Sequence, residues 1–413
     1  MLRPRGFALY CTTIVMALLS LPAIAHARGP LWTVVQDDAQ LLHKPESEVA
    51  ASLDRLRDLG VDTVRVTAGW SVLTRGADDR TQPGEFDQTD PAAYEQARFT
   101  ALDRVVRQAD ARGLRVLLDI AFWAPLWATT DTEGPRARTD VDADAYGRFA
   151  RALARRYNGS FTPPAAVEPV PPSQDSNLLE QLFGADDPPP PATAPSEGPL
   201  PRVQLFSLWN EPNHPAFLMP QSARGERGSP ASYRRMVRTA VAGIRTEQAG
   251  AKVLIGGLAS KGTNGRGVSP LRFLRELACV DGKLRPLRTK ECQGFTKVPG
   301  DGFTIHPYSL STPPDARPSA RQPDDVPLGA LPRMTKLLSR LVARKRLATG
   351  LRDVWITEYG YETNPPAKTT KYGLSDQVRF LPWAEYLAWR EPRVRAFAQF
   401  LLRDLPPAAT VQG

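Results

Sequence analysis

Short apolar segments alternate with amphipathic helical segments along most of this chain, and this alternation limits the folds open to it. The apolar segments are rich in Val, Ile, Leu and Phe, as expected for parallel strands buried on both faces. They span residues 31–38, 61–67, 114–121, 203–209, 252–257, 302–306, 354–358 and 394–400. The helical segments between them span residues 46–59, 91–112, 142–157, 230–248, a stretch beginning near Pro270, 331–347 and 375–389.

Repeated strand–helix units of this size form either a closed barrel or a doubly wound open sheet. No glycine-rich phosphate loop follows the first predicted strand, which argues against a dinucleotide-binding open sheet. The chain has 413 residues and 42% hydrophobic content, enough for one large core. We therefore predict an α/β fold, a (β/α)8 TIM barrel that occupies residues 28–413 as a single domain.

Two of the predicted strands end in a glutamate with polar or aromatic neighbours. Residues 209–213 read Trp-Asn-Glu-Pro-Asn, and the proline ends the strand because it cannot donate a hydrogen bond within a sheet. Residues 356–360 read Ile-Thr-Glu-Tyr-Gly. The two glutamates meet only if both strands point the same way, as in a barrel with its site at the strand C-termini. A facing pair of carboxyl groups predicts glycoside hydrolysis, whereas solvated strand-end turns are the competing interpretation.

Together the two motifs resemble those of the clan A glycoside hydrolases, which are retaining (β/α)8 enzymes. They are most similar to family 39 and its bacterial relatives, with family 5 a neighbour, and the order and spacing extend through residues 31–405. The resemblance implies that Glu211 is the acid/base and Glu358 the nucleophile. It implies substrate-binding or orienting roles for further strand-end residues, namely Asn210, Arg65, His306 and Tyr308. It implies a carbohydrate substrate without identifying the sugar or linkage, and we expect no cofactor and no metal.

Further candidates for sugar binding follow the first three predicted strands. Trp70, Trp123 and Trp127 offer aromatic faces on which sugar rings can stack, with core packing as the alternative. Three acidic residues at or near strand ends are candidates for binding substrate hydroxyl groups, namely Asp37, Asp38 and Asp119.

The C-terminal part departs from the clan in two ways. The clan commonly has Trp in the last strand, where residues 398–400 of this chain read Ala-Gln-Phe. This puts the recognition of the cleaved sugar in doubt. The residues after Asp404 are too few for a full eighth helix, so we expect a truncated C-terminal end of the barrel.

The first 27 residues have the pattern of a secretory signal peptide. Arg3 and Arg5 precede an apolar run over residues 7–24, and residues 25–27 read Ala-His-Ala, a small-residue cleavage site. We therefore expect a secreted or extracytoplasmic protein. If the segment is not cleaved, residues 7–24 would anchor the chain in a membrane.

Two cysteines follow this segment, Cys279 and Cys292, with a polar stretch rich in Lys and Arg between them. One close pair in an exported protein predicts a disulfide. A metal site is disfavoured, because no neighbouring His or Cys completes a set of ligands.

Residues 158–201 interrupt the alternation with several runs of proline. Such a segment cannot form regular helix or sheet and has little apolar surface to bury. We predict a flexible insert between the third helix and the fourth strand, on the barrel face remote from the chemistry. A role in gripping the cell wall or a partner is the alternative.

The charge balance narrows the set of partners. The chain has 53 Lys and Arg against 44 Asp and Glu, a net charge of +9. Because no dense basic run is interleaved with aromatic residues, nucleic acid binding is not expected. The positive balance favours weak attraction to acidic polysaccharide or an anionic cell envelope. The oligomeric state cannot be derived from the sequence.

The sequence thus predicts a secreted retaining glycoside hydrolase that cleaves O-glycosidic bonds, with β linkage expected, in a glycoside or polysaccharide by double displacement. Two alternatives stay open. One is a non-catalytic carbohydrate-binding or cell-envelope barrel, and the other is a transglycosylase that uses the same residues.

Overall fold

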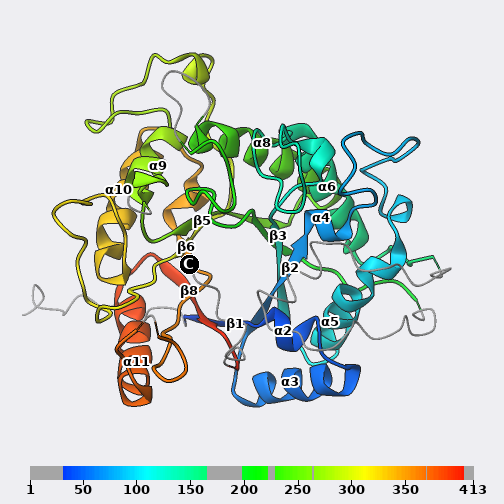
Figure 1. The fold of residues 1–413 in the computed structure, drawn as a ribbon, viewed down its shortest axis with the longest axis horizontal. Coiled ribbons are helices and arrows are strands. Elements are labelled where there is room, and N and C mark those ends of the chain that lie inside the picture. Colours follow the sequence, from blue (N-terminus) through cyan, green and yellow to red (C-terminus); the bar gives the residue numbers. More distant parts are fainter. Residues whose placement is uncertain (1–30, 165–197, 222–227, 263–264, 369, 404–413) are drawn as a thin grey trace, which may run out of the picture. The chain divides into compact units, whose positions relative to one another are not determined.

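The computed structural model describes residues 31–164, 198–221, 228–262, 265–368 and 370–403. Eight strands in these residues form a closed barrel in sequence order, and every neighbouring pair is parallel. The predicted α/β fold, a (β/α)8 barrel, is confirmed (Figure 1). The strands are β1 (Trp32–Gln36), β2 (Thr63–Gly69), β3 (Arg115–Ala121), β4 (Leu205–Leu208), β5 (Lys252–Ala259), β6 (Gly302–His306), β7 (Val354–Ile356) and β8 (Val394–Phe400).

The longer helices surround the barrel (Figure 1). They are α3 (Glu46–Asp58), α5 (Thr100–Asp110), α6 (Ala143–Arg156), α8 (Ser229–Glu247), α9 (Pro270–Leu277), α10 (Leu331–Ala343) and α11 (Leu374–Arg390). Short helices α2 (Asp38–Leu41) and α4 (Trp70–Leu73) follow β1 and β2. The 3-10 helices are η1 (Pro91–Ala93), η2 (Gln96–Phe99), η3 (Leu126–Ala128), η5 (Lys290–Cys292), η6 (Leu328–Ala330) and η7 (Thr349–Arg352).

Several predicted boundaries differ from the structure; α10, for example, ends at Ala343 and not at Leu347. β1 ends at Gln36 because the Asp37 side chain accepts a hydrogen bond from the Gln40 backbone at 3.1 Å and thereby begins helix α2. The single helix predicted over residues 91–112 is broken into η1, η2 and α5. The break surrounds Tyr94, whose buried hydroxyl donates to the Gln88 carbonyl at 2.9 Å and pulls the chain out of helical geometry.

The inside of the barrel changes from apolar to polar along the strands. An apolar cluster contains Val34, Leu117, Leu205, Leu254, Trp355, Ala396 and Ala398. Successive side chains of a strand alternate between its faces, so the next inward position lies two residues on. In three of these strands that position is polar, namely Gln36, Asp119 and Ser207. A packed apolar layer therefore supports a polar layer nearer the strand C-termini.

Helices α6 and α8 pack closely because glycines lie at their contact. A Cβ on Gly147 would lie 2.6 Å from the Thr239 Cβ, and one on Gly243 would lie 2.5 Å from the Gly147 carbonyl oxygen. Any larger residue would force the helices apart. This contact fixes the outer wall behind β4, the strand that leads to Glu211.

Several predicted features lie outside the described residues. These are the signal segment over 1–27 with its apolar run over 7–24, residues 165–197 of the insert, and residues 404–413 after β8. Within the described ranges, none of the helices combines the length and apolar character that crossing a bilayer requires.

The predicted disulfide between Cys279 and Cys292 is confirmed, with a Cα–Cα distance of 5.6 Å. It follows α9 and closes a loop that also contains η5. Cys279 is fully buried, so the bridge ties this loop to the body of the barrel.

We predict that the double variant Cys279→Ser with Cys292→Ser loses about 2–4 kcal/mol of unfolding free energy, because the loop gains entropy when unfolded. Chemical denaturation of the oxidised protein and the variant measures this loss. Reducing the wild type should reproduce it, and reducing the variant should change nothing. Equal denaturation midpoints for the oxidised, reduced and variant proteins would contradict the prediction.

Candidate active site

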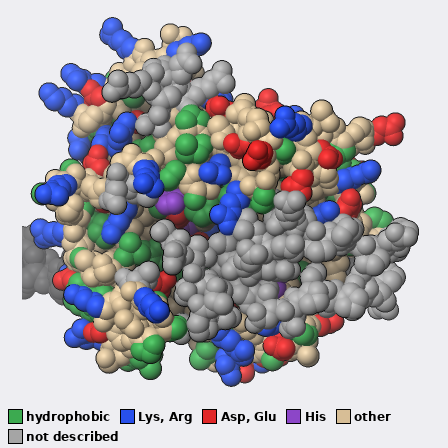
Figure 2. Space-filling view, viewed as in Figure 1, with side chains coloured by type: hydrophobic (Ala, Val, Ile, Leu, Met, Phe, Trp, Pro, Cys, Tyr) green, Lys and Arg blue, Asp and Glu red, His purple; other side chains and the backbone are tan. Residues whose placement is uncertain are grey.

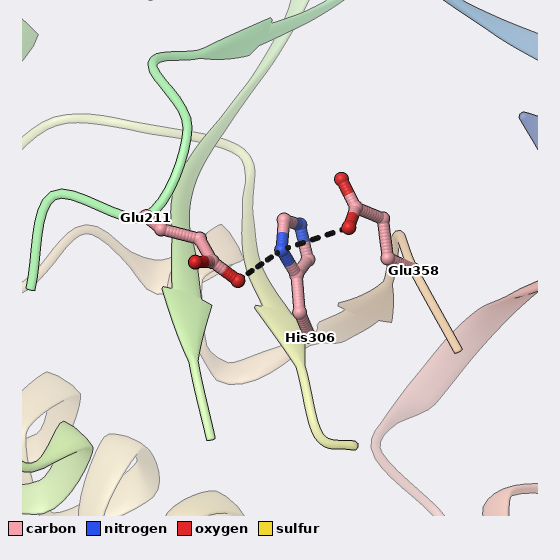
Figure 3. A group of neighbouring side chains, drawn as sticks. All are labelled: Glu211, His306 and Glu358. Carbon is pink, nitrogen blue, oxygen red and sulfur yellow. Dashed lines mark hydrogen bonds and ion pairs between the residues drawn. The ribbon is translucent and has the colours of Figure 1, made fainter. Parts of the chain in front are cut away.

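Three side chains from three strand ends meet at the mouth of the barrel (Figure 3). Glu211 follows β4, His306 ends β6 and Glu358 follows β7. The His306 Nδ1 atom lies 3.1 Å from Glu211 Oε1 and 3.4 Å from Glu358 Oε2. One carboxylate oxygen of each glutamate lies within 4.8 Å of the other. The two glutamates predicted from separate motifs therefore face each other across one imidazole.

A sharp turn aims Glu211 into the mouth. Trp209 and Glu211 have φ values of 61° and 40°, a region that side chains other than glycine rarely occupy. The Trp209 amide donates to the Ile120 carbonyl at 2.9 Å, and the Glu211 amide donates to the Gly257 carbonyl at 2.9 Å. Neighbouring strands β3 and β5 thus hold the turn on both sides. Strained backbone of this kind is concentrated at functional sites.

Glu358 lies in a cationic and hydrogen-bonded environment. Arg65 Nη1 is 2.7 Å from its Oε1, and the Tyr308 hydroxyl donates to its Oε2 at 3.2 Å. Burial alone would raise the pKa of Glu358, but His306, Arg65 and the hydrogen bonds outweigh it and hold the pKa below its usual value. Glu358 is therefore the carboxylate that the site keeps ionised.

Strand register explains how Arg65 is held. Gln36 of β1 lies opposite Arg65 of β2, and its side-chain oxygen accepts from the guanidinium. Asp119 of β3 lies 2.8 Å from Arg65 Nη2 and also accepts from Ser207 of β4, its register partner. Arg65 is 1% exposed, so these neutral and acidic partners replace the water it loses.

Aromatic residues close one side of the mouth. Tyr308 stacks on Tyr359 with ring centroids 6.2 Å apart, and its edge meets Phe400 at 6.5 Å. Phe400 is half-buried and ends β8, at the position where the sequence departs from the clan. Asn210 lies beside Glu211 on the same turn and is 7% exposed.

Two of the three tryptophans predicted to stack on sugar are part of the packing instead, and the third, Trp127, is half-buried with its ring centroid 6.3 Å from that of Trp70. Trp70 is 1% exposed, and its ring stacks on Phe149 at 5.8 Å. Trp123 is 2% exposed, and Phe217 stacks on its ring while Arg136 lies 5.0 Å from the centroid. These rings have no free face for a sugar, because Phe149 of α6 covers Trp70 and Phe217, which follows β4, covers Trp123.

The three acidic candidates are also buried. Asp37 accepts from the backbone amides of Leu402 and Arg403, each at 3.0 Å, and so holds the chain after β8. Asp119 is committed to Arg65, as described above. Asp38 is 2% exposed and accepts from the Thr67 amide at 3.2 Å. In this structure all three stabilise the mouth rather than face a substrate.

Among the described residues, the side chains of Glu211, His306 and Glu358 also lie close enough together to hold a metal ion. Arg65 lies on the Glu358 carboxylate, and a nearby cation disfavours a second one at the same oxygens. The expectation that the site uses no metal stays a prediction.

Sequence reasoning missed Gln36, Ser207 and Phe400 as parts of the site. A signal for the first two was available. Each lies two residues after an inward apolar position of the same strand, so a polar residue there points into the barrel. Phe400 lies two residues after Ala398, which is also in the inward apolar cluster, so the same alternation predicts that it points into the barrel.

No known family model matches this sequence, and no curated protein matches it. Among solved structures, the fold is similar to that of a family 39 glycoside hydrolase from the gut symbiont Bacteroides cellulosilyticus WH2. The TM-score is 0.52 at 16% identity, over 92% of this chain and 58% of the other. It is also similar to a family 1 β-glucosidase from Thermotoga maritima, with a TM-score of 0.51 at 12% identity, over 91% of this chain and 89% of the other.

These two comparisons confirm the expected likeness to glycoside hydrolase barrels at the level of the fold. At such identities the likeness extends no further than the fold. This chain spans 58% of the length of the family 39 enzyme.

Asp38 gives a test of the buried polar layer. Burial raises the pKa of Asp38 to about 6, against hydrogen bonds from Thr67 that lower it. Between the unfolded value of 3.8 and about 6 the native state binds more protons than the unfolded chain, so this carboxyl makes unfolding easier as pH rises. We predict that Asp38→Asn removes this fall and gains about 1–3 kcal/mol relative to wild type between about pH 4 and pH 7.

Urea denaturation at a series of pH values measures this difference. The exposed Asp110 supplies the control, because Asp110→Asn should leave the wild-type pH dependence intact. A pH dependence for Asp38→Asn that runs parallel to wild type would show that the buried carboxyl does not titrate in this window.

Proposed function

We propose that this protein is a retaining glycoside hydrolase that cleaves O-glycosidic bonds by double displacement. The observation that carries the proposal is the spacing of Glu211 and Glu358, with one oxygen of each within 4.8 Å of the other. Retaining enzymes place their two carboxyl groups about 5–5.5 Å apart, whereas inverting enzymes leave about 6.5–9.5 Å for a water molecule. The shorter spacing supports direct attack by one of the glutamates.

Glu358 is the nucleophile in this proposal, because its surroundings favour the ionised form. In the first step a Glu358 oxygen attacks the anomeric carbon while Glu211 gives its proton to the glycosidic oxygen. The bond to the leaving group breaks and a glycosyl ester forms on Glu358. In the second step Glu211 takes a proton from water, the water oxygen attacks the anomeric carbon, and Glu358 leaves as the carboxylate.

The surrounding residues have supporting roles. Arg65 and Tyr308 hold the Glu358 carboxylate at 2.7 Å and 3.2 Å and fix the direction of attack. His306 contacts both glutamates and orients Glu211. Asn210 binds the sugar 2-hydroxyl, in agreement with the sequence resemblance and with its place on the Glu211 turn.

The proposed substrate is a carbohydrate with β linkage, in a glycoside or a polysaccharide. The name of one structural neighbour, a β-glucosidase, supports this choice. The confirmed disulfide agrees with an extracytoplasmic location, and the signal pattern of residues 1–27 supports export. The net charge of +9 supports a loose association with the cell envelope.

We predict that Glu358→Ala lowers turnover of an aryl β-glycoside by at least about a thousandfold, because no ester can form. Added azide should restore part of the activity and give a glycosyl azide of inverted configuration. Glu211→Ala should instead lose least on substrates whose leaving group needs no proton, and added azide should replace water in the slowed second step and give the retained product.

The anomeric configuration of each product is read by NMR. Glu48→Ala, which changes an exposed glutamate on α3, is the matched control and should keep wild-type turnover. A wild-type product of inverted configuration would rule out the retaining mechanism. Full turnover by both glutamate variants on every glycoside in a broad panel would rule out catalysis at this site.

A further inference from the structure

Helix α11 exposes an unusual amount of apolar surface. Six large hydrophobic side chains are exposed among the described residues, and four belong to this helix. They are Leu374 at 67%, Val378 at 65%, Tyr386 at 52% and Trp389 at 47% exposed. With exposed Pro382 they recur every three or four residues, which places them along one side of the helix. This set is called the α11 stripe below.

The fold does not use the stripe. The helix packs on the barrel through Phe380, Ala384 and Ala388, which are at most 2% exposed and lie on its other side. An exposed contiguous apolar surface of this kind marks an interaction site. The stripe is therefore a candidate binding surface for a partner outside the described residues.

The chemistry of the stripe resembles that of helices at membrane interfaces. Tyr386 and Trp389 stack with ring centroids 6.0 Å apart, and the Arg390 guanidinium lies 5.7 Å from the Tyr386 centroid. Tyr and Trp favour the boundary between headgroups and acyl chains, and arginine reaches the headgroups. Figure 2 shows hydrophobic side chains beside Lys and Arg side chains at the lower left, where Figure 1 places α11.

The charged side chains near the stripe favour an anionic surface as its partner. The exposed charged residues on α11 and just before it are Lys371, Arg379 and Arg390 against Glu385. Arg379 pairs with Asp376 at 2.9 Å, which leaves Lys371 and Arg390 as the cations that a bilayer with anionic headgroups can bind.

The sequence has an apolar run a short length of chain before the first described residue. The described chain starts at Leu31, and Trp32 pairs with Ala396 of β8, six residues after α11 ends at Arg390. The apolar run over residues 7–24 is separated from Leu31 by residues 25–30, which span at most about 25 Å. If the segment is not cleaved and the run lies in a bilayer, this length of chain would keep α11, itself about 25 Å long, within reach of the lipid.

We propose that the α11 stripe docks on the surface of an anionic lipid bilayer. The helix lies on the side of the barrel, so docking leaves the end that carries Glu211 and Glu358 open to substrate. The docking is independent of the reaction at that end.

Photolabelling of the full chain tests this proposal. Vesicles of phosphatidylethanolamine and phosphatidylglycerol carry a phospholipid with a photoreactive acyl chain, and mass spectrometry locates the labelled peptides. We expect label on the peptide that contains Val378 and Trp389, and none on the exposed face of α3. Vesicles of phosphatidylcholine alone should label α11 at least about tenfold less.

The triple variant Val378→Ser, Tyr386→Ser and Trp389→Ser should lose labelling of α11 by about tenfold or more, since three apolar groups no longer enter the lipid. Labelling of residues 1–30 within the same chain is the internal reference and should not change. Leu59→Ser, at an exposed leucine outside the stripe, is the matched control and should label as wild type. Thermal unfolding of each variant checks that the barrel is intact.

Two results would overturn the proposal. One is label confined to residues 1–30, with none on α11. The other is a dimer in solution that the triple variant dissociates, with α11 unlabelled in vesicles, which would make a second copy of the chain the occupant.

Discussion

The buried guanidinium of Arg65 is the interaction on which the arrangement of the barrel mouth depends. It is 1% exposed and binds Glu358 at 2.7 Å and Asp119 at 2.8 Å. Removing a cation from water to this depth costs several kcal/mol of folding free energy unless the cation is paired and hydrogen-bonded. Its partners come from β1, β3 and the end of β7, so pairing this one charge also fixes how three strands present their polar residues. The closed barrel makes that possible, because all its strand C-termini meet at one end.

The same network separates buried carboxyl groups by protonation state. Burial raises the pKa of Asp119 and Asp38, even though both lie near Arg65. Glu358 is buried as well, but it also faces His306 and accepts from Tyr308, so its pKa falls instead. A site whose surroundings lower the pKa of one carboxyl group while burial raises the pKa of its neighbours is suited to nucleophilic attack by that one group. The difference comes from the number of cations and donors around each group, since all three are removed from water.

The sequence predicted the barrel well because its signals are local. β6 and β8 have the predicted bounds, since apolar runs ended by polar or proline residues identify buried parallel strands. The two glutamates and Arg65 were found because strand ends converge in any barrel. Trp70 and Trp123 were placed wrongly because the loops that cover them, including the one with Phe217, come from elsewhere in the chain. The pairing of Asp119 with Arg65 needed the register between β2 and β3, which composition does not encode.

The end of β8 differs from the clan at a position that would contact the sugar in the proposed function. The clan that the motifs resemble commonly has Trp in this strand, and this chain has Phe400 with its ring against the edge of Tyr308. A phenyl ring gives an apolar face but no N–H donor, whereas an indole gives both. In the proposed function, hydrogen bonds to the cleaved sugar would come from other residues of the mouth, among them Asn210 beside Glu211. The chemistry at Glu211 and Glu358 is unaffected by this exchange, because Tyr308 still holds Glu358 at 3.2 Å. In the proposed function, the change at β8 therefore bears on which sugar fits and not on how its bond is broken.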